Sequence, residues 1–176
     1  MTTILMAIAG AIGALLFMAS RKPDTFSVTR KASMAATPEA VFAQVNDLVA
    51  WQAWSPWAKK DPNAKAIFGT VTAGEGATFR WEGNNKVGIG TMTIVESQPF
   101  ETIRFRLDFE KPFKATNAAE FRFQSDGNGI TVVVWTMTGH ANLMSKVMDT
   151  LMNMDKMVGA DFEQGLANLK AIVEAR

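Results

Sequence analysis

The chain begins with an apolar run from Thr2 to Ala19 that contains no charged side chain. As a helix rising about 1.5 Å per residue, this run would extend roughly 27 Å, close to the hydrocarbon thickness of a bilayer. Arg21 and Lys22 follow it directly, and the positive-inside tendency would then keep the rest of the chain in the cytoplasm. The pattern predicts a single transmembrane anchor at residues 1–20.

A cleaved signal peptide is the competing interpretation of this run. No Lys or Arg precedes it, and Phe17-Met18-Ala19 is a poor small-x-small cleavage site, so the pattern favours retention. Small residues also recur within it at helical spacing and form a stripe on which a partner transmembrane helix could pack. They are Ala7, Gly10, Ala11 and Ala14. Small residues that merely fill a short anchor would give the same stripe.

Behind a linker at residues 21–25, the alternation of apolar and polar residues over Phe26–Met34 predicts a half-buried strand. Thr37-Pro38-Glu39 then supplies an N-cap, a proline at the first helical position and an acid in the first turn. We expect a helix from there to Asn46 or Asp47.

Three indoles fall within seven residues, in Trp51-Gln52-Ala53-Trp54-Ser55-Pro56-Trp57. Trp51 and Trp54 lie three apart, on one face of a predicted short helix that Pro56 stops. Their ring nitrogens need hydrogen-bond partners if the rings are buried. The rings would plug one end of the core, line a pocket, or do both.

From Ala64 to Thr138, alternating runs are separated by turns rich in Gly, Pro and Asn, which predicts an antiparallel meander. The inward positions are Ala77, Phe79, Trp81, Gly88, Gly90, Met92, Ile94, Ile103, Phe105, Leu107, Phe109, Ala119, Phe121, Phe123, Val133, Trp135 and Met137. The outward positions are Arg80, Glu82, Thr91, Thr93, Arg104, Arg106, Asp108, Glu120 and Arg122. Gly88 and Gly90 would permit a sharp bend or the approach of a bulky group, and we favour the bend.

From about Met144 to Ala175 the spacing is helical, which predicts a long amphipathic helix. A break near Asn153 would leave Met144–Met152 as a separate short helix or lid.

This order of elements resembles the SRPBCC or START-like helix-grip superfamily, and the residues at the junctions narrow the resemblance to bacterial proteins of the polyketide cyclase/dehydrase type. The matching segments are Ala36–Phe42, Trp51–Trp57 with Asp61-Pro62, Gly88–Ile94, Thr131–Trp135 and Asp161–Lys170. The resemblance implies an α+β fold at residues 26–176, in which a curved antiparallel sheet wraps around the C-terminal helix over a cavity. It also points to a bacterial inner membrane for the anchor.

The amino-acid composition argues against several classes of function. The net charge of +1 offers no field for a phosphate backbone, so nucleic acid is not an expected partner. No cysteine and a single histidine, His140, argue against disulfides and most metal sites, and we expect no cofactor. The 12 Phe, 11 Met and 5 Trp suit an adaptable apolar cavity, although an ordinary core would use the same residues.

The favoured function is a membrane-anchored protein that binds an apolar small molecule or lipid. The predicted lining residues are Trp54, Phe79, Trp81, Met92, Phe105, Leu107, Trp135, Met137, Met154, Val158 and Phe162. The same side chains could instead meet in a filled core.

Two alternatives belong to other classes. A cyclase or aromatase would need proton-exchanging groups, for which His140 and Glu82 are weak candidates, with Arg80 and Asp108 behind them. An accessory subunit would dock its anchor on a larger membrane complex through the small-residue stripe.

Overall fold

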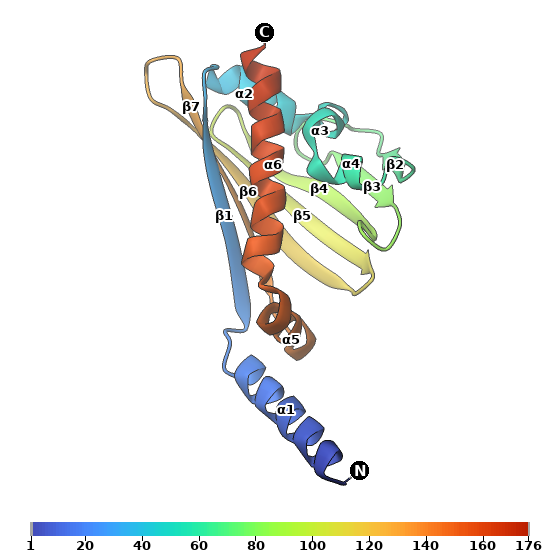
Figure 1. Cartoon of the computed structure of the whole chain (residues 1–176). Coiled ribbons are helices and arrows are strands. Elements are labelled where there is room, and N and C mark those ends of the chain that lie inside the picture. The colour runs from blue at the N-terminus through green and yellow to red at the C-terminus, as the bar shows by residue number, and fades with distance from the viewer. Residues whose placement is uncertain (1, 176) are drawn as a thin grey trace.

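One seven-stranded antiparallel sheet, with strand order β1-β7-β6-β5-β4-β3-β2, forms the body of the domain (Figure 1). The structure is a computed structural model and describes residues 2–175. The strands are β1 (Thr25–Met34), β2 (Lys65–Phe68), β3 (Thr78–Glu82), β4 (Ile89–Gln98), β5 (Thr102–Lys111), β6 (Ala115–Ser125) and β7 (Thr131–His140). The predicted meander is therefore confirmed, and β1 joins it by pairing with β7.

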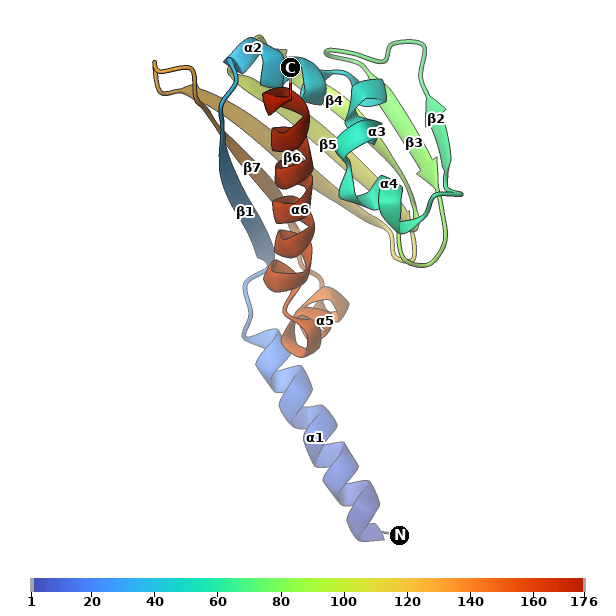
Figure 2. The same cartoon turned by 45° about the horizontal axis from the view of Figure 1, so that its top comes forward.

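Within residues 2–175, six helices accompany the sheet. They are α1 (Thr2–Ser20), α2 (Pro38–Asn46), α3 (Leu48–Trp54), α4 (Pro56–Lys60), α5 (Leu143–Met152) and α6 (Met154–Glu174). Helix α6 crosses the concave face of the sheet and buries Phe162, Leu166, Leu169 and Val173 (Figures 1 and 2). This is the expected α+β helix-grip arrangement.

The predicted break in the C-terminal helix lies at Asn153, which adopts a left-handed conformation with φ 49°. Asparagine tolerates this conformation better than most residues, and its side chain also caps α6 by accepting a hydrogen bond from the Lys156 N–H. Helices α5 and α6 are therefore separate helices joined at one residue.

The expectation that Pro56 stops a helix is wrong in one respect. Helix α3 does end at Trp54, but Pro56 begins a further helix, α4, after the single residue Ser55. Proline suits a first helical position because its missing N–H would have had no partner there. The short α4 brings Trp57 over the sheet, where its ring packs on Trp135.

The two inward glycines do more than bend the sheet. A register shift lies between Ile89 and Gly90, as expected for a bulge. However, a Cβ on Gly90 would stand 2.4 Å from the Trp81 indole. The close approach of a bulky ring, the explanation that we did not favour, is thus what Gly90 permits.

Helix α1 extends away from the domain and is almost entirely exposed (Figures 1 and 2). By length and composition, Thr3–Ser20 could cross a membrane. Among residues 3–20, only Ala19, near the end of α1, is fully buried, and α1 packs against α5.

Candidate functional site

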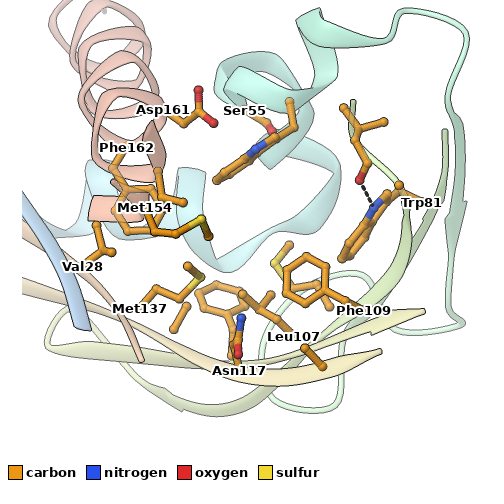
Figure 3. A pocket seen from close by; sticks show the side chains of 18 of the residues that line it. Val28, Ser55, Trp81, Leu107, Phe109, Asn117, Met137, Met154, Asp161 and Phe162 are labelled. Carbon is orange, nitrogen blue, oxygen red and sulfur yellow. Dashed lines mark hydrogen bonds between the residues drawn. The ribbon is translucent and has the colours of Figure 1, made fainter. Parts of the chain in front are cut away.

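A cavity of about 800 Å³ lies between the concave face of the sheet, α6 and the α3–α4 segment (Figure 3). The strands supply its floor through alternate side chains such as Met92, Leu107 and Met137, because residues two apart on a strand face the same side. Met154, Val158 and Phe162 of α6 cover it, at helical spacing. The sheet and helix therefore enclose open space rather than a completely filled core.

Ten of the eleven predicted lining residues surround this cavity, and Trp54 does not. Its ring is fully buried, and its indole N–H donates to the Gln44 carbonyl at 3.0 Å. Trp51 and Trp57 line the cavity instead. Trp54 is thus a core plug, while its neighbours face the cavity.

Aromatic side chains that pack on one another form one wall of the cavity. The indole N–H of Trp81 donates to the Val87 carbonyl at 3.0 Å, and its ring packs edge-on against Phe109, with centroids 5.7 Å apart. The missing side chain of Gly90 leaves room for the ring. Trp81 therefore keeps a fixed orientation at one side of the cavity.

A few polar groups interrupt the apolar lining. Ser55 is only 4% exposed, and its side chain does not cap α4. Asn117 lies on the floor, and Asp161 at the edge accepts from Lys60 at 2.6 Å (Figure 3). Among the described residues, the indole N–H of Trp135 has no hydrogen-bond partner. Sparse polar groups in an apolar cavity suit a ligand that is mostly apolar with a small polar part.

The sequence offered weaker signals for these polar residues. Ser55 follows a helix without any periodic pattern of its own, so nothing marked it as a cavity residue. Asn117 is in line with Ala119 and Phe121 on the inward parity of its strand, and that alternation could have identified it.

The cavity reaches the end of the domain where four segments converge. The linker contributes Lys22, α5 contributes Lys146 and Asp149, the β3–β4 turn contributes Lys86, and the end of β5, at the β5–β6 turn, contributes Lys111. Of the four, the linker and α5 are joined by ion pairs, Lys22 to Asp149 and Lys146 to Asp24, each at 2.5 Å. The hydrogen bond from Lys22 lowers the pKa of Asp149, and that from Lys146 lowers the pKa of Asp24.

The catalytic candidates do not assemble into a site. His140 lies at the cavity rim, but Glu82 is not among the lining residues and pairs with Arg80 at 3.0 Å. Hydrogen bonds that the Arg80 guanidinium donates to the Glu110 and Glu82 carboxylates raise the pKa of Arg80 further above its usual range. The Thr116 hydroxyl and Arg106 lower the pKa of Asp108. Arg80 and Asp108 therefore stay charged near neutral pH, and neither of them lines the cavity.

In the described part of the chain, no group of three or more His, Asp or Glu side chains is placed to hold a metal ion.

Solved structures share this fold at low sequence identity. A protein from Chromobacterium violaceum, CV1439, is 17% identical with a TM-score of 0.60, over 87% of this chain and 99% of that one. A hypothetical protein from Helicobacter pylori is 12% identical with a TM-score of 0.64, over 84% and 88%. The di-domain ARO/CYC protein StfQ of the steffimycin biosynthetic pathway is 12% identical with a TM-score of 0.64, over 86% of this chain and 51% of its own.

At these low identities the structural likeness shows the fold alone, whereas a match in sequence can show the family. No curated protein of known function matches the chain. A family profile, however, matches residues 25–174, from the start of β1 to the end of α6, which is most of the chain. The chain belongs to the family described as polyketide cyclase / dehydrase and lipid transport.

Proposed function

We propose that the chain binds an apolar small molecule or lipid in the cavity beneath α6, while α1 anchors it in a membrane. The observation that carries this proposal is the cavity itself, about 800 Å³ of space with a mostly apolar lining. That volume lies within the range of roughly 300–1,000 Å³ typical of small-molecule sites. Burying a ligand's apolar surface would supply the binding free energy, at about 25 cal/mol per Å².

The distribution of charge supports binding rather than catalysis. The strand carboxylates and guanidinium groups pair with one another on the outward face, as Arg104 does with Glu96 and Glu120, each at 2.7 Å. The polar groups inside, such as Ser55 and Asn117, can orient a ligand through hydrogen bonds. Neither is a strong acid or base.

The exposure of α1 supports the anchor. Ile4, Leu5, Met6 and Phe17 are each more than 60% exposed, although a soluble protein rarely leaves so large an apolar surface in water. A core helix would be mostly buried, unlike Thr3–Ser20. Insertion into a bilayer would remove this surface from water.

A cyclase-type activity is the second candidate, favoured by the family description and by the position of His140 at the cavity rim. It would use the same cavity, so ligand binding comes first in either case.

The binding test uses a matched pair of neighbours on β6. Ala119 is buried and lines the cavity, whereas Ala118 beside it is exposed. The full chain, purified in mild detergent, is titrated with the fluorescent fatty acid cis-parinaric acid. Ala119→Phe should weaken binding at least tenfold by filling the cavity, and Ala118→Phe should leave it unchanged.

Thermal melts of both variants would show that each remains folded. Equal affinities for the two variants, or no binding of the probe by the unmodified chain, would contradict the proposal. Native mass spectrometry of the chain from its own cells would then identify the resident molecule.

A further inference from the structure

Helix α5 is amphipathic, but it turns its polar face toward the rest of the protein and its apolar face outward. Its most buried side chain is Lys146, at 8% exposed, while four of its large apolar residues are exposed. These exposed residues are Leu143, Met144, Leu151 and Met152, each more than 50% exposed. A helix in water would turn this face toward the core. Some other apolar environment must therefore suit the outward face.

Two ion pairs fix the rotation of α5 about its axis. Lys146 binds Asp24 and Asp149 binds Lys22, so both of its charged side chains face the linker that follows α1. Asp149 also accepts a hydrogen bond from the Met154 N–H at 2.7 Å, which ties α5 to the start of α6. With its polar face held in this way, α5 presents its apolar face away from the domain.

This apolar face lies at the same end of the molecule as α1. Helix α1 packs against α5, and both views place α5 between the domain and the end of α1 (Figures 1 and 2). Strand register places the β5–β6 turn at this end too, because Thr25 pairs with His140, Gly139 with Asn117, and Phe109 with Ala115. The turn carries Phe113, which is 63% exposed, between Lys111 and Lys114.

An exposed aromatic ring between lysines suits the surface of a bilayer. The ring can enter the boundary between headgroups and acyl chains, and each lysine near anionic lipid is attracted to the negative surface. The apolar residues of α5 would be buried at the same depth. The lining of the cavity includes residues of α5 and of the β5–β6 turn, so the cavity extends to this end of the domain.

We propose that this end of the domain, formed by α5 and the β5–β6 turn, rests on an anionic bilayer surface and that the cavity opens onto that surface. The inference depends on the membrane anchor of the proposed function. It adds a second contact with the bilayer and a route by which an apolar ligand enters the cavity without crossing water.

The absence of cysteine from the sequence makes the test direct. Leu151→Cys and Phe113→Cys, each labelled with the environment-sensitive dye NBD, report on the proposed contact. Ile130→Cys is the matched control, because Ile130 is also exposed but lies in the β6–β7 turn at the opposite end of the sheet. Each labelled full chain is reconstituted in vesicles of phosphatidylcholine and phosphatidylglycerol, with or without a lipid that carries a doxyl quencher.

We expect the labels at positions 151 and 113 to shift to the blue and to be quenched several-fold more than the label at position 130. Equal quenching at all three positions, in a chain that floats with the vesicles, would overturn the membrane contact while leaving the anchor intact. A chain that does not float would overturn both. A blue shift that grows with the number of chains per vesicle, without quenching by the doxyl lipid, would mean that the surface contacts a second copy of the chain. That result would contradict the proposal.

Discussion

The rings of Trp135 and Phe162 lie parallel, with centroids 3.9 Å apart and 4° between their planes. Trp135 is on β7 and Phe162 is on α6, so this stack joins the sheet to the helix that crosses it. Both rings are almost completely buried, and both border the cavity. The same pair thus supports the fold and forms one side of the candidate site.

Removing one ring should destabilise the domain strongly. Phe162→Ala deletes a buried aromatic side chain and leaves a void, which typically costs about 3–5 kcal/mol. Urea denaturation followed by tryptophan fluorescence would measure the loss. Met157→Ala, an exposed position on the same helix, should change stability by no more than about 0.5 kcal/mol. Similar losses in the two variants would contradict the importance of the stack.

A methyl group at Gly165 should also disturb this packing. Its Cβ would lie 2.9 Å from Trp135 Cζ3 and 3.2 Å from Pro56 Cδ, and neither ring can move freely. Alanine favours a helix over glycine by about 1 kcal/mol, but overpacking costs about 1–3 kcal/mol. We expect a net loss of stability for Gly165→Ala in a thermal melt. A clear gain would show that the helix can shift at this point.

Gly159 offers a double-mutant cycle. A Cβ there would stand 1.9 Å from the Arg30 guanidinium, which pairs with Glu163 at 2.7 Å and with Asp155 at 3.2 Å. In the Arg30→Ala background, Gly159→Ala should stabilise the domain by about 1 kcal/mol through helix propensity. In the natural background it should give markedly less, because the methyl displaces Arg30. Equal effects in both backgrounds would mean that the two sites are independent.

The contact between α5 and the linker should fail in acid. A hydrogen bond from Lys22 and another from the Met154 N–H lower the pKa of Asp149 below its ordinary value of 3.8. A lowered pKa gives stability that is present above the ordinary value and lost as the pH falls through the pKa of the folded state. Hydrogen-exchange protection of α5, corrected for intrinsic rates, should therefore hold from pH 7 to about 5 and fall below 3.8.

Asp149→Asn provides the matching test at neutral pH. It keeps the shape of the side chain but removes the charge that binds Lys22, so α5 should exchange faster at pH 7 while the strands are unaffected. Unchanged protection of α5 in this variant would show that the ion pair does not hold the helix in place.

The features that sequence could predict are those set by local spacing. Alternation assigned Met92, Phe105 and Met137 to the concave face, and all three line the cavity, because strand geometry permits only two faces. The break near Asn153 was also predicted, and the structure places it at a residue with a positive φ. The role of Met92, Phe105 and Met137 in binding a ligand stays a prediction.

Features that depend on contacts distant in sequence were not predicted. Helical spacing places Trp51 and Trp54 on one face, and only the position of α3 over the sheet turns one toward the cavity and the other into the core. The packing of Trp81 on Gly90 likewise requires the register of β3 with β4. Nor could periodicity show that the space between sheet and α6 is hollow, since filled and open cores have the same pattern.

The proposed opening of the cavity at the end that carries α1 would determine which concentration of ligand governs its occupancy. For a molecule that enters from the bilayer, occupancy would follow its mole fraction among the lipids rather than its amount in the surrounding water. The search for the opening would then take place in two dimensions, by lateral diffusion. Diluting a suspension of vesicles would leave occupancy unchanged, whereas adding empty lipid to the same membrane would lower it.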